Sequence, residues 1–312
     1  MTEPDFNVNA LNQAHNQAQV NYDEAQHLIG WPLQVNFPAL LTKNDPRAIR
    51  ASLSLIKKIN REDLLAWYKS WVQGDTLTMT VTGDIDVDVV IREVGAVFGS
   101  LPTLISKEET SPKPRPITFA KGIHRTFHVD TKDKASRIII RYPLDIKKEN
   151  KYLLPLTQNL IQEALRLTLR EEERAIYAPQ VSFSTNAQGL MQNTLDILLS
   201  GDRSKATFIK NRALNVVTAL AQKGVTAAQF ELAKTTLGDM LKRQDENLGF
   251  WLDYLSSNNR HLSELSHPDA RPALLEKITI KDMNAYLKKY FLPSNTSTAI
   301  IHGTPKKLQD KK

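Results

Sequence analysis

The chain has no cysteine among its 312 residues. Without a thiol it forms no disulfide, has no thiolate nucleophile and builds no cysteine-ligated zinc or iron–sulfur site. The absence does not separate a reducing compartment from an oxidising one. Any chemistry of the chain must therefore come from other side chains.

Long apolar runs are absent as well. No segment reaches the roughly 18 to 20 apolar residues that are needed to cross a bilayer. The amino terminus, MTEPDFNVNALNQAHNQAQ, is polar and lacks the basic-then-apolar order of an export signal. We therefore expect a soluble globular chain with no membrane span and, as the sequence is written, no export or targeting signal.

The positive charge is not concentrated in one place. The net charge is +7 and the pI is near 9.3, values that are compatible with binding to nucleic acid. The basic residues are spread along the chain, however. Their densest groups are in the carboxy-terminal tail, with Lys306, Lys307, Lys311 and Lys312, and on one predicted helix, with Lys288–Lys289. We expect a solvated basic surface and no nucleic-acid partner.

Motifs for self-contained catalysis are missing too. The sequence contains no H-x-x-E-H or H-E-x-x-H zinc motif, no P-loop, no G-x-G-x-x-G and no G-x-S-x-G elbow. We expect no catalytic residue, no metal ligand and no cofactor site within this chain.

Two pairs of histidines are close in sequence. His124 and His128 have the i, i+4 spacing by which a helix binds zinc, but their context, GIHRTFHVD, alternates as a strand does. On a strand the two imidazoles would be roughly 13 Å apart at ~3.3 Å per residue, too far to share one metal. His261 and His267 fit no common zinc spacing, and we expect them at exposed helix ends.

A proline-rich stretch, LPTLISKEETSPKPRPITFAK at residues 101–121, interrupts the periodic pattern and predicts a linker. Before it, Thr76–Thr82 alternates as a strand, Gly83–Asp84 predicts a turn, and Val87–Phe98 has helical spacing. After it we expect strands near 123–130, 137–142, 177–185 and 193–199, a long helix over 153–173, several helices over 206–290, and a closing strand ending at Gly303.

The chain also contains an internal repeat. The segment around Ile59–Gly83 recurs about 219 residues later around Ile278–Gly303, with one slip near its end. Six residues match at that offset: Leu55, Lys58, Ile59, Asp63, Ala66 and Lys69 match Leu274, Lys277, Ile278, Asp282, Ala285 and Lys288. The second copy lies at the end of a much longer unit than the first copy does. We therefore expect the first unit to lack its amino-terminal part.

The run LREEERAIY, residues 169–177, is the one local group of candidate binding residues. Arg170 is predicted in the last turn of the helix and Tyr177 at the start of the next strand, so both donors could lie over one groove. A guanidinium and a phenol suit peptide carbonyls or a developing oxyanion. The alternative is that Arg170 pairs with Glu163 or Glu173 and that Tyr177 only packs.

These segments resemble the pitrilysin/insulinase family of zinc peptidases. TLTMTVTGDIDVDVVIREVGAVFGSLP resembles a segment that closes a domain in that family, and LREEERAIYAPQVSFS resembles its carboxy-terminal half, where an arginine precedes a tyrosine by seven positions. The resemblance implies homologous α+β units paired across a chamber, with zinc in one half and substrate-binding groups in the other. It places Arg170 and Tyr177 near the scissile carbonyl of a bound peptide.

The resemblance also implies a domain plan. The expected fold is α+β, with a mixed, mainly antiparallel sheet packed with helices, a truncated first unit and a complete second one. Residues 1–104 would be the carboxy-terminal part of the incomplete unit, 105–121 the linker, 122–304 the complete unit and 305–312 a basic tail. We expect exposed apolar surface on the incomplete unit, around Leu53, Ile56, Trp67 and Trp71.

The expected function is the substrate-binding, non-catalytic portion of a zinc metallopeptidase. Cleavage would require a zinc-bearing half, either upstream or in a partner chain, because the H-x-x-E-H site is missing here. The alternatives are a non-enzymatic peptide-binding or scaffold protein derived from the family, and an unrelated basic adaptor. The expected compartment is the periplasm for a full-length exported protease and the cytoplasm for this chain expressed as it stands.

Overall fold

The computed structural model describes residues 4–71, 78–99, 115–146, 150–185, 190–257 and 270–304. The chain forms two compact units, and each is discontinuous in sequence. One consists of Met1–Gln17, Ser54–Lys113 and Gly238–Ala273, and the other of Ala18–Leu53, Pro114–Leu237 and Leu274–Lys312. The domain limits expected from the sequence remain a prediction.

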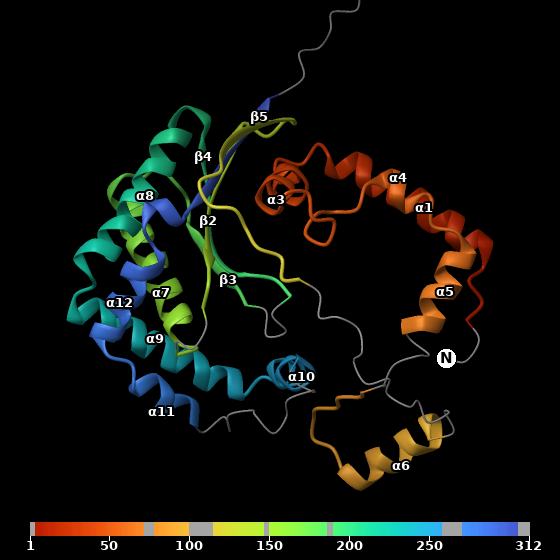
Figure 1. Cartoon of the computed structure of the whole chain (residues 1–312). Helices are drawn as coiled ribbons and strands as arrows, with labels where there is room; N and C mark the ends of the chain where they lie inside the picture. Colours follow the sequence, from red (N-terminus) through yellow and green to blue (C-terminus); the bar gives the residue numbers. More distant parts are fainter. Residues whose placement is uncertain are drawn as a thin grey trace, which may run out of the picture. The chain divides into compact units, whose positions relative to one another are not determined.

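The larger unit is built on one five-stranded sheet of order β1-β5-β2-β4-β3 (Figure 1). β1 pairs with β5 in parallel and the other neighbours are antiparallel, which confirms the α+β class and the mixed, mainly antiparallel sheet. β5, last in the chain, lies between β1 and β2. The strands are β1 (His124–Asp130), β2 (Ala135–Leu144), β3 (Gln180–Ser184), β4 (Asn193–Asp202) and β5 (Ser297–Thr304).

Helices cover one face of this sheet. α7 (Leu153–Leu165), α8 (Ala206–Lys223) and α12 (Ile280–Tyr290) pack together there (Figure 1). α8 packs on β2, whose Ile138 and Ile140 are both 0% exposed. This layer is the main core of the unit, because the apolar stripe of a helix is stable only when another element covers it.

The opposite face is covered by α2 (Trp31–Gln34) and α3 (Asn36–Thr42). Phe37 and Leu41 of α3, each 1% exposed, form a second core cluster with Val129, Ile139 and Ile301 of the sheet. Residues 18–53, which precede the proline-rich stretch in the sequence, thus contribute to the fold of the larger unit.

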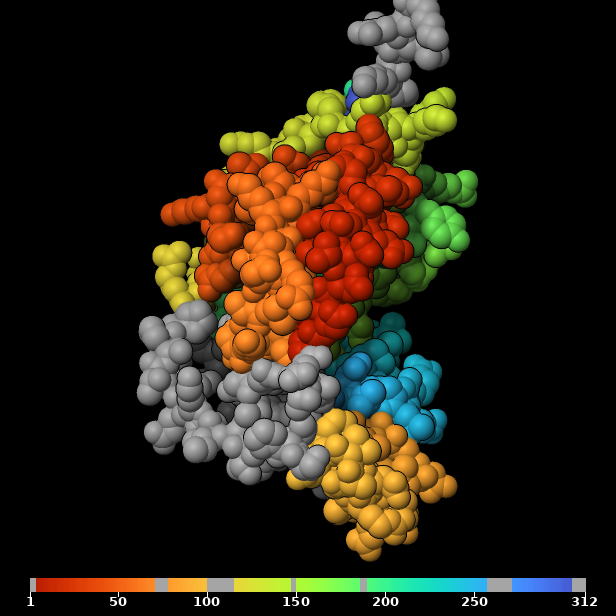
Figure 2. Space-filling view, turned by 90° about the vertical axis from the view of Figure 1, so that its right-hand side faces the viewer, coloured from red at the N-terminus to blue at the C-terminus, as the bar shows by residue number. Residues whose placement is uncertain are grey.

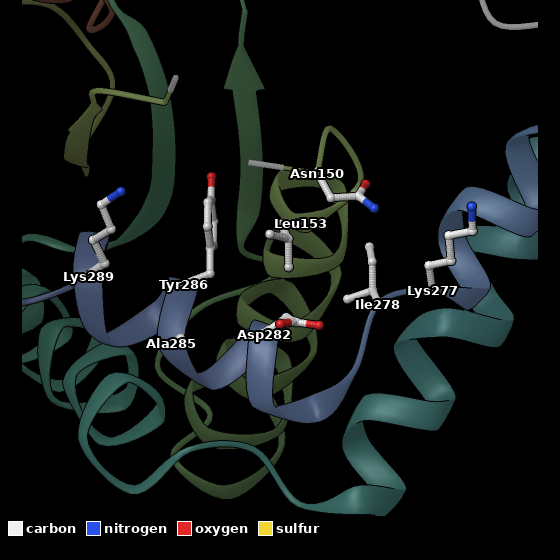
Figure 3. Close-up of a pocket in the computed structure, with 8 residues that line it drawn as sticks. All are labelled: Asn150, Leu153, Lys277, Ile278, Asp282, Ala285, Tyr286 and Lys289. Carbon is white, nitrogen blue, oxygen red and sulfur yellow. The ribbon is translucent and has the colours of Figure 1, made fainter. Parts of the chain in front are cut away.

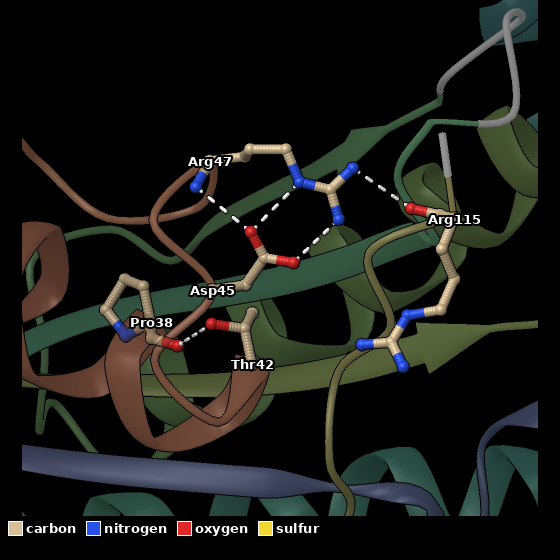
Figure 4. Close-up of polar contacts among 5 residues, drawn as sticks. All are labelled: Pro38, Thr42, Asp45, Arg47 and Arg115. Carbon is tan, nitrogen blue, oxygen red and sulfur yellow. Dashed lines mark hydrogen bonds and ion pairs between the residues drawn. The ribbon is translucent and has the colours of Figure 1, made fainter. Parts of the chain in front are cut away.

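The chain after α3 is joined to residue 115 by a hydrogen bond from Arg47, which also forms an ion pair with Asp45 (Figure 4). The Asp45 carboxylate accepts hydrogen bonds from the Arg47 backbone N–H at 3.1 Å and from its guanidinium Nη2 at 2.7 Å. Arg47 Nη1 also donates to the backbone oxygen of Arg115 at 3.0 Å. The bonds from Arg47 lower the pKa of Asp45 to about 2, so the carboxylate stays charged at any physiological pH.

The remaining helices are α1 (Val8–Ala25), α4 (Leu53–Ile56), α5 (Arg61–Trp71), α6 (Val87–Phe98), α9 (Ala227–Asp245), α10 (Leu248–Ser257) and α11 (Ala270–Glu276). The helix predicted over 87–98 is confirmed, and Asp86 caps it by accepting a hydrogen bond from the Val89 N–H. The strand predicted over 76–82 is wrong where the structure describes it, because residues 78–82 have no strand conformation. Residues 76 and 77 lie outside the described part.

The internal repeat is visible in the helices. α5 and α12 have the same length of 11 residues and start at positions 219 apart, the offset found in the sequence. Asn60 and Asp63 exchange hydrogen bonds of 2.8 and 3.0 Å before α5. Thr279 and Asp282 exchange equivalent bonds of 3.0 and 3.2 Å before α12. Both helices therefore begin with the same reciprocal capping arrangement.

Candidate substrate-binding site

The helix that carries Arg170 changes type along its length. α7 ends at Leu165 and continues as a π-helix, η1 (Arg166–Glu172), in which the Glu173 N–H bonds to the Thr168 oxygen at 3.0 Å. The long helix predicted over 153–173 is confirmed as far as Glu172, and it is π-helical after Leu165. π-helical segments are rare and occur frequently at functional sites.

The wider turn also alters which residues are buried. Leu167 is 39% exposed, whereas Leu165 and Leu169 are both 0% exposed. Leu169 anchors the end of η1 in the core. Arg170, the next residue, is exposed.

A tight reversal follows η1 and presents Tyr177. Arg174 takes a left-handed backbone with φ of 49°, and the Ala175 N–H bonds to the Leu169 oxygen at 2.8 Å. Ile176 is buried and forms an isolated bridge with Gly201 of β4. The sequence predicted that Tyr177 begins the next strand. This is wrong, because β3 begins only at Gln180.

Arg170 and Tyr177 lie side by side. The guanidinium carbon of Arg170 is 5.7 Å from the centroid of the Tyr177 ring, a cation–π distance. The Tyr177 side chain is nevertheless 87% exposed. Both polar groups are thus available to a bound molecule, and the ring contact limits the positions open to the guanidinium.

The neighbouring glutamates are paired with other arginines. Glu163 receives two hydrogen bonds of 2.7 Å from Arg166, which also pairs with Glu171. Those bonds from Arg166 lower the pKa of the Glu163 carboxyl. Glu173 pairs with Arg212 at 3.3 Å. The alternative reading, in which Arg170 pairs with Glu163 or Glu173, is not the arrangement seen.

Two glutamines of α7 hold the segment that follows Tyr177. Gln162 donates to the Pro179 oxygen at 2.7 Å and accepts from the Val181 N–H at 2.8 Å, while Gln158 donates to the Val181 oxygen at 2.7 Å. These amides take the place of a neighbouring strand along the outer edge of β3. Neither glutamine was predicted as a site residue from the sequence, where their i, i+4 spacing on a helix was the only signal.

The histidines that the structure describes form no zinc site. His124 and His128 lie on strand β1, as predicted, and His124 Nδ1 lies 2.9 Å from the Thr298 hydroxyl. The His128 ring faces His302 of β5 at a centroid distance of 5.5 Å. Burial, followed by the nearby charges of Arg203 and His128, lowers the pKa of His302.

Among the described residues no group of three or more histidine, aspartate or glutamate side chains is arranged to hold a metal. His261 and His267 lie outside those residues. The donor set that a catalytic zinc needs is therefore not found in the described parts, and no step of a reaction can be derived through zinc here.

Two cavities of the larger unit lie at other places. One of about 350 Å³ is lined by Asn150 and Leu153 at the start of α7 and by residues of α12 and the segment before it, including Tyr286 and Lys289 (Figure 3). Another of about 550 Å³ lies between the end of α3 and residues 115–120. Neither is lined by Arg170 or Tyr177, so the candidate site is an exposed surface and not an enclosed pocket.

No described helix is long and apolar enough to span a bilayer.

The larger unit is an α+β fold with an exposed Arg170–Tyr177 pair, and the sequence has no H-x-x-E-H motif. The family model for the inactive domain of M16 peptidases matches residues 58–237. The chain therefore belongs to the M16, or pitrilysin/insulinase, peptidase family, as a domain of the inactive, carboxy-terminal type.

Solved structures share the fold at low sequence identity. The M16 inactive domain from Pseudomonas fluorescens is 14% identical with a TM-score of 0.72, and the match covers 97% of this chain and 72% of that one. The periplasmic protease PqqL from Escherichia coli is 15% identical with a TM-score of 0.69, covering 96% of this chain and 33% of PqqL.

The first half of PqqL, solved separately, matches with a TM-score of 0.68 at 14% identity, covering 97% of this chain and 72% of that chain. The fold alone therefore does not tell one half of such a protease from another. The assignment to the inactive type comes from the family model.

Proposed function

We propose that this chain is the substrate-binding, non-catalytic portion of a zinc metallopeptidase and that Arg170 and Tyr177 bind the peptide near the scissile bond. The observation that carries the proposal is the exposed Arg170–Tyr177 pair at 5.7 Å. Glu163 and Glu173 pair with Arg166 and Arg212, so these two carboxylates do not engage the Arg170 guanidinium.

The chemistry of the pair suits a peptide backbone. A guanidinium donates through a planar fork of N–H groups, and a phenol donates from a stiff ring that loses little conformational freedom on binding. Together they can donate to one carbonyl oxygen, and such donors stabilise the charge that develops on that oxygen during hydrolysis. Gln158 and Gln162 support the pair by holding Pro179 and Val181 beside α7.

The metal chemistry belongs to a partner half. A bound zinc ion would supply an activated water, but its ligands and base would come from outside this chain. We propose pairing with a zinc-bearing half of the same fold and, by analogy with exported relatives, work in the periplasm. We also propose that residues 1–104 are the carboxy-terminal part of an incomplete first unit, which the repeat of α12 in α5 supports.

Reconstitution tests this function. The full chain is mixed with a candidate zinc-bearing half, and peptide hydrolysis is followed with and without the chain. We expect hydrolysis only on mixing, and its loss with Arg170→Ala or Tyr177→Phe. Peptide binding without turnover in every pairing would favour the alternative, a non-enzymatic peptide-binding or scaffold protein. An H-x-x-E-H motif encoded just upstream of Met1 would identify the partner half directly.

A further inference from the structure

The cavity of about 550 Å³ lies within the larger unit, between the end of α3 and residues 115–120. Its volume falls in the range of roughly 300–1,000 Å³ that is usual for ligand pockets. Leu41, Ile117 and Phe119 form its base and are 1%, 5% and 8% exposed. Both walls reach the surface, where orange-red and yellow atoms lie next to each other (Figure 2). The cavity is thus an open hollow with an apolar base.

The charged side chains at this cavity are mainly cationic. Lys43 and Arg115 line it and are exposed, and neither side chain forms a salt bridge or a hydrogen bond with a described residue. Asp45 is the one acid among the described residues that line it, and the Arg47 guanidinium neutralises it through two hydrogen bonds. The charge of Arg115 is the smallest of the causes that lower the pKa of Asp45. An excess of positive charge therefore remains to attract an anionic ligand.

Arg115 is well placed to bind such an anion. Its backbone oxygen accepts a hydrogen bond from Arg47 Nη1 at 3.0 Å, which fixes the main chain at the cavity wall. Figure 4 shows its guanidinium directed away from Arg47, on the side of the end of α3, where Thr42 lies. A guanidinium binds a carboxylate through two parallel N–H···O bonds. The chemistry of this wall therefore favours a carboxylate.

The end of α3 does not oppose an anion as strongly as an open helix end would. A helix carboxy-terminus carries a partial negative charge on its free carbonyl groups. Here three of these oxygens accept hydrogen bonds within the protein: Pro38 from the Thr42 hydroxyl at 2.8 Å, Ala39 from the Asn44 N–H at 2.8 Å, and Leu41 from the Ala120 N–H at 2.7 Å. The repulsion of an anion at this wall is reduced accordingly.

Thr118 has a backbone donor and acceptor on the opposite wall. The neighbouring Ile117 bonds to the segment before β4: its N–H donates to the Leu190 oxygen at 2.9 Å, and its oxygen accepts from the Gln192 N–H at 2.8 Å. Successive residues of an extended chain direct their backbone groups to opposite sides, so those of Thr118 point away from that segment. The Thr118 N–H and oxygen form no hydrogen bond with any described residue. An extended peptide can pair with them as it does at a sheet edge.

We propose that this cavity binds the carboxy-terminal end of a peptide. The terminal carboxylate pairs with Arg115, and the charge of Lys43 adds to the attraction. The peptide backbone pairs with Thr118, and an apolar last side chain packs on Leu41 and Phe119. A peptide terminus is the occupant that these walls complement, because it has a carboxylate, backbone amide groups and a side chain next to one another.

Fluorescence anisotropy with a labelled peptide tests the proposal. The probe is a fluorescein-labelled alanine pentapeptide that ends in leucine, made as the free acid and as the carboxamide, and it is titrated with the full chain. We expect the acid to bind at least ~10-fold more tightly than the amide, because the amide loses the charge-assisted bonds to Arg115. Arg115→Gln should abolish this difference. The matched control, Arg125→Gln, removes the same charge from an exposed arginine that lines neither cavity, and it should keep the difference.

Thr118→Pro removes one N–H group and should weaken binding of the acid and of the amide by the same factor, with an unchanged circular dichroism spectrum. Equal affinities of the acid and the amide, a difference that persists in Arg115→Gln, or no saturable binding below about 1 mM would overturn the proposal.

Sodium acetate separates a peptide site from a general anion site. Acetate has neither a peptide backbone nor a large side chain, so it should compete much more weakly than the unlabelled peptide. Equally strong competition would overturn the assignment to a peptide terminus. The result does not depend on the proposed substrate site, because Arg170→Ala should leave the difference between acid and amide unchanged.

Discussion

Alanine substitution at the two equivalent aromatic positions of the repeat should have very different consequences. Tyr286 on α12 is 3% exposed and its ring contacts Tyr290 at 4.8 Å and Phe291 at 6.2 Å. Truncating a buried aromatic residue removes its burial and leaves a cavity, at a loss of about 3–5 kcal/mol. Trp67 on α5 is 54% exposed, so Trp67→Ala in the isolated chain should lose no more than about 1 kcal/mol.

Urea unfolding followed by far-ultraviolet circular dichroism measures both losses. We expect the unfolding midpoint of Tyr286→Ala to fall clearly and that of Trp67→Ala to stay near the wild type, with unchanged slopes. Equal losses in the two variants would refute the reasoning, because α5 would then be as well covered as α12.

Other changes have equally definite outcomes. Tyr177→Phe should alter the free energy of unfolding by less than about 0.5 kcal/mol, as measured by urea unfolding, because the hydroxyl is exposed. Gln162→Leu should destabilise the chain by about 1–3 kcal/mol and speed amide exchange at Val181, since it removes the bonds to Val181 and Pro179. The pKa of His302 is lower in the folded chain than in the unfolded chain, mainly because the ring is buried. Below pH about 6.5 the unfolded chain therefore binds a proton at His302 more readily than the folded chain does, and this favours unfolding. Its contribution to stability should be complete above that pH and decrease as the pH falls, and His302→Asn should flatten this dependence in pH-dependent thermal unfolding.

Much of the sheet and of α6 could be predicted from local pattern. Runs such as Arg137–Tyr142 and Val87–Phe98 carry the period of their elements within a few residues. The strand predicted over 76–82 is wrong at residues 78–82, the part that the structure describes, for a physical reason. Its pattern is that of a central strand, but strand conformation needs neighbouring strands to accept and donate its hydrogen bonds.

The candidate site was only half predictable. The sequence resemblance placed Arg170 and Tyr177 together, but not the π-helix, because the residues of η1 favour an α-helix equally well. The Gln162 bonds and the His128–His302 contact join positions 19 and 174 residues apart. Such contacts depend on tertiary packing and strand register, and sequence spacing does not give them.

The most direct test of the substrate-binding role is kcat/KM for peptide hydrolysis by the assembled enzyme, comparing the wild-type chain with Arg170→Ala and Tyr177→Phe at saturating partner. Loss of one oxyanion donor lowers kcat by about 100-fold or more in other hydrolases. We predict a fall of at least ~10-fold in each variant, with unchanged stability and unchanged pairing. Rates equal to the wild type in both variants would contradict the assignment of Arg170 and Tyr177 to the bound peptide.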